Sequence, residues 1–110
     1  MSDLAVLFAH QRRLMAKLGV EDLREGVEIT RRRVAAEREQ LETATRRRTL
    51  AEGINDAETV AVAAKFEAQF AERLAVLERK LDAQEAEFGL AERDYDEMVA
   101  QLKKASVGAG

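Results

Sequence analysis

The fold is decided near the middle of this 110-residue chain by the stretch Ala51-Glu52-Gly53-Ile54-Asn55-Asp56-Ala57-Glu58. Gly53 suits the left-handed backbone conformation in which a helix commonly ends. Asn55 then suits the N-cap of a following helix, with Glu58 at the third helical position as in a capping box. The stretch therefore predicts a tight connection between two helices that pack antiparallel as a hairpin.

The segment after this connection carries a regular apolar repeat. Its members are spaced alternately by four and three residues: Phe70, Leu74, Leu77, Leu81, Gln84, Phe88, Ala91, Tyr95, Met98 and Leu102. A repeat of 3.5 residues over several heptads is typical of a left-handed coiled-coil seam. We therefore predict one helix over about 56–104, followed by a flexible C-terminal tail at 105–110.

The segment before the connection follows the same spacing with more polar interruptions. Its members are Val20, Leu23, Val27, Thr30, Val34, Glu37, Leu41, Ala44, Arg48 and Ala51. Gly19, followed by Asp22 and Glu25 as a capping box, indicates a helix stop and a new start. We therefore predict separate helices over about 3–18 and 22–52. The alternative is one unbroken helix kinked near Gly19, because isolated glycines are tolerated inside helices.

The first 18 residues carry a wider set of apolar side chains, which we call the N-terminal stripe. It consists of Leu4, Leu7, Phe8, Leu14, Met15 and Leu18. A stripe of this width predicts contact with two neighbours rather than one, so these residues are the predicted oligomer or partner interface. A helix lying on a membrane surface is the alternative, since Arg12, Arg13 and Lys17 flank the stripe. Packing of this helix on the hairpin is favoured.

The predicted fold class is all-α: an antiparallel hairpin of long, coiled-coil-like helices with a short N-terminal helix. The predicted hairpin seam contains Val27, Val34, Leu41, Phe70, Leu74, Leu77, Leu81, Phe88, Tyr95 and Met98. Two paired helices cover only one side of each other. We therefore expect the chain to self-associate into a helical bundle, with a homodimer favoured.

Charge is sorted along the chain. Residues 1–55 carry 11 Lys and Arg against 9 Asp and Glu, whereas residues 56–110 carry 7 against 12. Folding the chain back so that facing residue numbers add up to about 108 brings Glu85 near Arg24 and Glu92 near Lys17. Complementary charge beside matched apolar layers predicts that the two arms pair with each other.

Two arginine triplets, Arg31-Arg32-Arg33 and Arg46-Arg47-Arg48, are the candidate anion-binding residues. Guanidinium groups match phosphate geometry, so the triplets suit nucleic acid or an anionic membrane surface. The competing interpretation is a solvated helix face held by ion pairs. It expects the pairs Glu28–Arg32, Arg33–Glu37, Glu42–Arg46 and Arg48–Glu52, and we favour it.

The composition offers little for catalysis. The chain has no Cys, Pro or Trp, a single histidine, His10, and a net charge of −3. This excludes disulfide scaffolds, cysteine-based zinc sites and thiol enzymes, and it does not favour nucleic acid as a partner. The mid-chain glycine turn is similar to that of small secreted hairpins marked by a Trp-x-Gly turn, but the tryptophan is missing. No family is assigned.

The sequence thus predicts a cytoplasmic, non-enzymatic helical interaction module of the adaptor or scaffold type. It would act by self-association and by contacts with a protein partner of unknown identity. No cofactor or metal is expected, and neither nucleic acid nor membrane is the favoured partner. The alternative function is binding of an anionic partner, nucleic acid or membrane surface, through Arg31–Arg33 and Arg46–Arg48.

Overall fold

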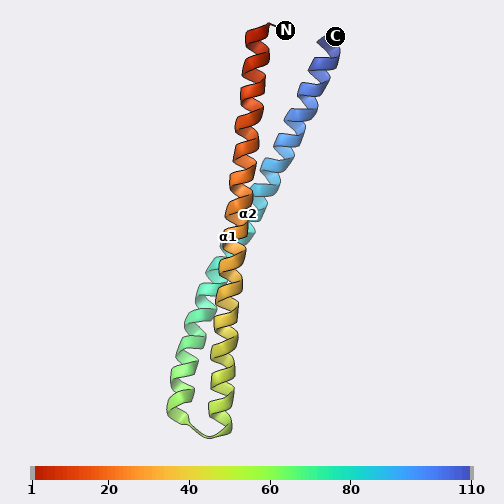
Figure 1. The fold of residues 1–110 in the computed structure, drawn as a ribbon. Helices are drawn as coiled ribbons and strands as arrows, with labels where there is room; N and C mark the ends of the chain where they lie inside the picture. The colour runs from red at the N-terminus through yellow and green to blue at the C-terminus, as the bar shows by residue number, and fades with distance from the viewer. Residues whose placement is uncertain (1, 110) are drawn as a thin grey trace. The chain divides into compact units, whose positions relative to one another are not determined.

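The computed structural model describes residues 2–109 and contains two long helices (Figure 1). Helix α1 spans Asp3–Gly53 and helix α2 spans Ala57–Ala109. No strand occurs among the described residues. The two helices pack against each other after a short turn, which confirms the predicted all-α helical hairpin.

Each of two compact units contains one segment of each helix. The turn unit is Glu28–Asp82, and the terminal unit combines the part of α1 up to Val27 with the part of α2 from Ala83 onward. The buried residues of the turn unit are Thr30, Val34, Ala44, Ala51, Ala63 and Leu77. This core is one layer thick and rich in alanine, so most of the surface of each helix stays exposed.

The predicted separate helix over 3–18 is wrong, because α1 continues through Gly19 without a break. A Cβ atom added at Gly19 would meet nothing within 4 Å, so no tertiary contact forces the chain to turn there. Asp22 and Glu25 lie inside the helix instead of capping a new one. The cost of about 1 kcal/mol for one glycine in a helix is too small to end it. The predicted tail is also helical as far as Ala109.

The turn uses different residues from those predicted. Asn55, with φ of 56°, takes the left-handed conformation, and Gly53 remains in the helix. The Asn55 N–H donates to the Glu52 carbonyl at 3.2 Å, and the Asp56 N–H donates to the Ala51 carbonyl at 2.9 Å. This pair of bonds is the Schellman arrangement, which satisfies carbonyls at a helix end. Asparagine is one of the few residues that adopt this conformation at low cost.

Asp56, rather than Asn55, caps the start of α2. Its carboxylate accepts hydrogen bonds from the Thr59 N–H at 3.1 Å and from the Thr59 hydroxyl at 2.6 Å. Thr59 therefore occupies the position that the sequence assigned to Glu58. These bonds, the hydroxyl first, lower the pKa of Asp56 from its ordinary value of 3.8.

We expect Asp56→Ala to lower the thermal unfolding midpoint, because the Thr59 N–H loses its partner at the helix start. The folded-state pKa of Asp56 is lowered, so this stabilisation is present above the unfolded-state pKa. It is lost as the pH falls through the folded-state pKa. Circular dichroism melts from neutral pH into the acid range test this: the midpoints of the wild type and Asp56→Ala should converge in acid. Asp56→Asn, which still caps, serves as control. A gap that stays constant with pH would contradict the assignment.

The pairing of the helices is shifted from the predicted register. In the predicted register, the numbers of facing residues add up to about 108. In the structure, the sums lie between 110 and 116 for four cross-helix contacts: Gly26–Gln84, Arg48–Glu67, Arg38–Glu78 and Arg24–Glu92. The reason lies in the turn, because α1 extends to Gly53 and residues 54–56 form the link. The apolar layers therefore match a few residues further along α2 than expected.

Candidate interaction surfaces

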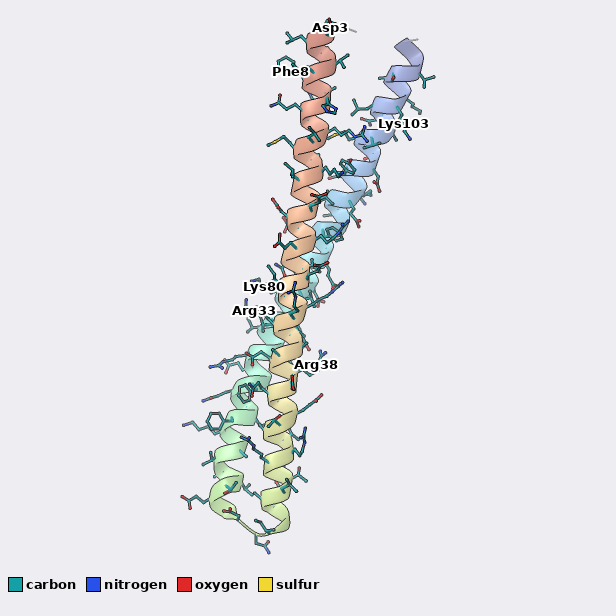
Figure 2. All side chains as sticks on the ribbon, in the orientation of Figure 1. Asp3, Phe8, Arg33, Arg38, Lys80 and Lys103 are labelled. Atoms are coloured by element: carbon teal, nitrogen blue, oxygen red, sulfur yellow. The ribbon has the colours of Figure 1, made fainter. Side chains whose placement is uncertain are left out.

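The N-terminal stripe is an uncovered apolar surface of α1. Its six side chains are between 49% and 65% exposed, and Phe8 points away from α2 in Figure 2. Within the first 18 residues, only Ala9 and Ala16 are partly covered among the residues that the structure describes. The α2 helix of the terminal unit therefore leaves the stripe open.

The stripe lies on the face of α1 opposite to α2. Ala9 and Ala16 continue the four–three repeat of Val20 and Leu23 toward the N-terminus, and all four are half-buried. At 3.6 residues per turn, the centre of the stripe lies about 150° around the helix from this repeat. The prediction that the N-terminal helix packs on the hairpin is therefore wrong. Since α1 is continuous, the stripe cannot fold back onto the hairpin.

Acidic residues end the stripe at its C-terminal side. On the same face of α1, Leu18 is followed by Glu21, Asp22 and Glu25, all exposed. At the other end, α1 begins at Asp3, and the Ser2 hydroxyl accepts a hydrogen bond from the Ala5 N–H at 3.2 Å. The stripe is therefore bounded by a capped helix start and by a cluster of carboxylates.

In the terminal unit, α2 contacts the other side of α1. The Arg24 guanidinium lies 5.5 Å from the centre of the Phe88 ring and 3.9 Å from the Glu92 carboxylate. At Gly26, an added Cβ atom would stand 3.4 Å from Gln84 Nε2. Val27, Phe88, Tyr95 and Met98 of the predicted seam are buried or half-buried here. These contacts lie on the face of α1 that does not carry the stripe.

Arg48 is a structural residue rather than a free anion ligand. It is half-buried on the seam of the turn unit, where its Nε lies 3.1 Å from both oxygens of Glu67. Its Nη1 donates to Glu52 Oε1 at 2.7 Å. Glu52 first, and then Glu67, raise the pKa of Arg48, while the Thr45 side chain and then Arg48 lower the pKa of Glu67. The sequence placed Arg48 on the four–three repeat but did not predict its pairing with Glu67.

The other arginines of the two triplets lie at the surface. Arg32, Arg33, Arg46 and Arg47 are exposed, and within residues 2–109 none of them forms an ion pair with a carboxylate. Of the four ion pairs expected along α1, the structure shows Arg48–Glu52. Arg31 is exposed but engaged in an interaction. The structure thus leaves more arginine charge unpaired than the sequence suggested.

The remaining predicted seam residues lie between the helices of the turn unit. Val34 and Leu77 are buried, and Leu41, Phe70, Leu74 and Leu81 are half-buried. The Phe70 ring lies 6.2 Å from that of Phe66, centre to centre, and the Phe66 side chain is half exposed. Phe66 lines a groove of about 330 Å³ with Val62 and Arg47. This apolar groove is a surface that the sequence did not predict.

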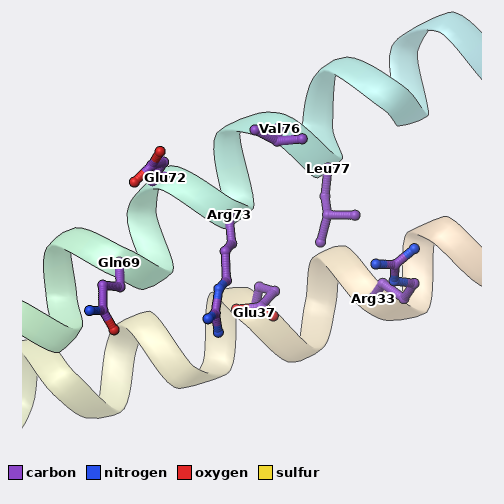
Figure 3. Close-up of a pocket in the computed structure, with 7 residues that line it drawn as sticks. All are labelled: Arg33, Glu37, Gln69, Glu72, Arg73, Val76 and Leu77. Carbon is purple, nitrogen blue, oxygen red and sulfur yellow. The ribbon is translucent and has the colours of Figure 1, made fainter.

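A second groove of about 490 Å³ lies nearer the middle of the helices, with Arg33, Glu37 and Arg73 among its lining residues (Figure 3). One oxygen of Glu37 is buried without a hydrogen-bond partner. Charges of both signs line this groove. Among the described residues, no group of three or more His, Asp or Glu side chains gathers where it could hold a metal ion. His10 is exposed on α1.

Neither helix, over its described residues, combines the length and the apolar character that a membrane crossing requires. Comparison of the chain with protein-family models, with curated proteins and with solved structures yields no match. The exposed surfaces of the two helices are therefore the features that bear on function.

Proposed function

We propose that this chain is a non-enzymatic helical interaction module that self-associates and contacts protein partners, as an adaptor or scaffold does. The observation that carries the proposal is the N-terminal stripe, six large apolar side chains at least 49% exposed on the face of α1 opposite to α2. Contiguous apolar surface of this kind marks interaction sites in soluble proteins.

The shape of the core supports self-association. A single layer between two helices, with alanine at several of its buried positions, covers little apolar surface. Pairing with a second copy, most simply as a dimer with coiled-coil packing, would add a second apolar layer on the uncovered face of α1. The absence of cysteine suits a reducing cytoplasm, which is the location that we propose.

Sedimentation equilibrium and light scattering over a range of protein concentrations test the proposal. We expect a mass that rises from one chain toward two as the concentration increases into the micromolar range. A strict monomer at tens of micromolar would overturn self-association. Capture of a protein partner that competes with self-association would locate that partner at the same stripe.

A second candidate function is binding of an anionic polymer or surface through Arg32, Arg33, Arg46 and Arg47. It is favoured by their exposure and by their lack of carboxylate partners within the described part of the chain. If this function holds, retention on heparin should fall steeply with salt, because each phosphate or sulfate contact releases counterions. Replacing the four arginines by glutamine should abolish retention, whereas Arg12→Gln with Arg13→Gln should retain most of it. No retention at low salt would exclude this function.

A further inference from the structure

We propose that the partner of the N-terminal stripe is the same stripe of a second copy, running antiparallel with Gln11 at the two-fold axis. This inference rests on the proposed self-association and specifies its orientation and register. Gln11 is exposed and lies at the centre of the stripe face, with apolar residues three, four and seven positions away on both sides. The apolar pattern is therefore the same in both directions along α1.

An antiparallel pair about Gln11 matches every layer of the stripe. The facing residues are Leu4 with Leu18, Leu7 with Met15, and Phe8 with Leu14, each occurring twice by symmetry. An interface across a two-fold axis requires this self-complementarity, in which residue i meets residue j and j meets i. The two Gln11 amides meet at the axis, where each can both donate and accept a hydrogen bond. A polar pair at one apolar layer fixes the register.

The charges on the same face select the antiparallel orientation. A parallel pair matches the apolar layers equally well, but it continues into Glu21, Asp22 and Glu25 of both copies. These carboxylates would then lie side by side and repel each other. In the antiparallel pair, the carboxylates of each copy pass beyond Asp3 of the other, next to the start of its helix. A helix start carries a partial positive charge, which attracts carboxylates.

The charges on the flanks of the stripe do not by themselves select an orientation. Asp3 and Lys17 lie on the same flank of α1, and an antiparallel pair brings the same flanks of the two copies together. In the register centred on Gln11, Asp3 of one copy faces position 19 of the other. Its distance from Lys17 is then about two residues, or roughly 3 Å, along the axis. Glu21 lies equally far from position 19 on its other side and on the same flank as Asp3, so Asp3 meets charges of both signs there.

The size of the stripe is sufficient for a reversible dimer. Six large apolar side chains, each about half exposed or more, present on the order of 600 Å² per copy, the upper end of what a typical monomer shows. Two copies together bring on the order of 1,200 Å², which reaches the lower end of specific interfaces. We therefore expect a dimer that dissociates on dilution rather than a permanent one.

Disulfide trapping tests the orientation cleanly, because the wild-type chain has no cysteine. The variants are Leu4→Cys, Leu18→Cys and Gln11→Cys, each made in the full chain. In mixtures, one of the two variants carries a tag, so that mixed dimers differ in mass from self-dimers. Positions 4 and 18 are about 21 Å apart along one helix, whereas a disulfide needs Cα atoms within about 7 Å. Each orientation therefore predicts a different set of covalent dimers under mild oxidation.

We expect Gln11→Cys to form a disulfide-linked dimer, and Leu4→Cys mixed with Leu18→Cys to form the mixed dimer at least ten times faster than Leu4→Cys alone. A dimer in which Leu4→Cys pairs with itself would overturn the antiparallel inference but leave the proposed self-association standing. A monomeric mass with no trapped dimer would overturn both. A monomer that binds anionic vesicles through the stripe would overturn both in favour of a lipid partner.

Discussion

The double variant Leu7→Glu with Leu14→Glu is expected to abolish self-association, raising the dissociation constant of the dimer at least about 100-fold. Burying one leucine side chain stabilises a complex by about 1.5–3 kcal/mol. Two per copy are lost, and each 1.4 kcal/mol changes the dissociation constant tenfold. The introduced carboxylates would also have to be buried without partners. Because both residues face away from α2 in the monomer, the helical hairpin itself should remain intact.

The matched control is the double variant Ile29→Glu with Leu50→Glu. Both residues lie on α1, and their exposures of 47% and 67% resemble those of Leu14 and Leu7, but neither belongs to the stripe. The control adds the same charge and removes similar apolar groups. Sedimentation equilibrium should give a monomer for the stripe variant and a wild-type dissociation constant for the control. An equal shift in both would show that net charge, rather than the stripe, governs association.

The variant Leu77→Ala is expected to reduce the free energy of unfolding by about 2–4 kcal/mol, the range for truncating a buried leucine. Leu77 is 7% exposed and belongs to a core in which most other buried residues are small. There is little neighbouring apolar surface to close the space that it leaves. For a domain held by one layer, a loss of this size is a large part of the total stability.

Val76→Ala is the control, since Val76 is the adjacent residue of α2 and is 52% exposed. Its truncation should change the free energy of unfolding by less than about 0.5 kcal/mol. The higher helix propensity of alanine offsets part of the lost apolar contact. Urea unfolding followed by circular dichroism measures both variants at one protein concentration. Equal losses for Val76→Ala and Leu77→Ala would contradict the assignment of the seam to the Leu77 face of α2.

The residues of the candidate interface could be identified from the sequence, but the structure changed what they are expected to contact. The wide apolar stripe in residues 4–18 can be recognised from the sequence, because the spacing of apolar residues along a helix determines which of them share a face. The sequence predicted that a separate helix over 3–18 would turn back at Gly19 and cover the stripe by packing on the hairpin. The structure shows a continuous helix there, so the same six residues become an outward face. The Arg48–Glu67 pair could not be predicted, since its partners come from different helices and the predicted register set Arg48 opposite position 60, seven residues from Glu67.

The sequence by itself determined an all-α hairpin of long helices joined near residue 54, although it wrongly divided the first helix at Gly19. The evidence is local: two four–three repeats, almost no helix breakers and a turn signal at Gly53. Such patterns can be read from the sequence because the period of a helix is fixed by its backbone. Only the tertiary structure decided which residues make the turn, because Gly53, Asn55 and Asp56 are all acceptable there. Which of them takes the left-handed conformation and which caps α2 depends on the hydrogen bonds formed at the end of α1 and at the start of α2. The structure also decided which side of α1 meets α2. That choice leaves the N-terminal stripe exposed, because a helix can present only one of its two apolar faces to a single neighbour.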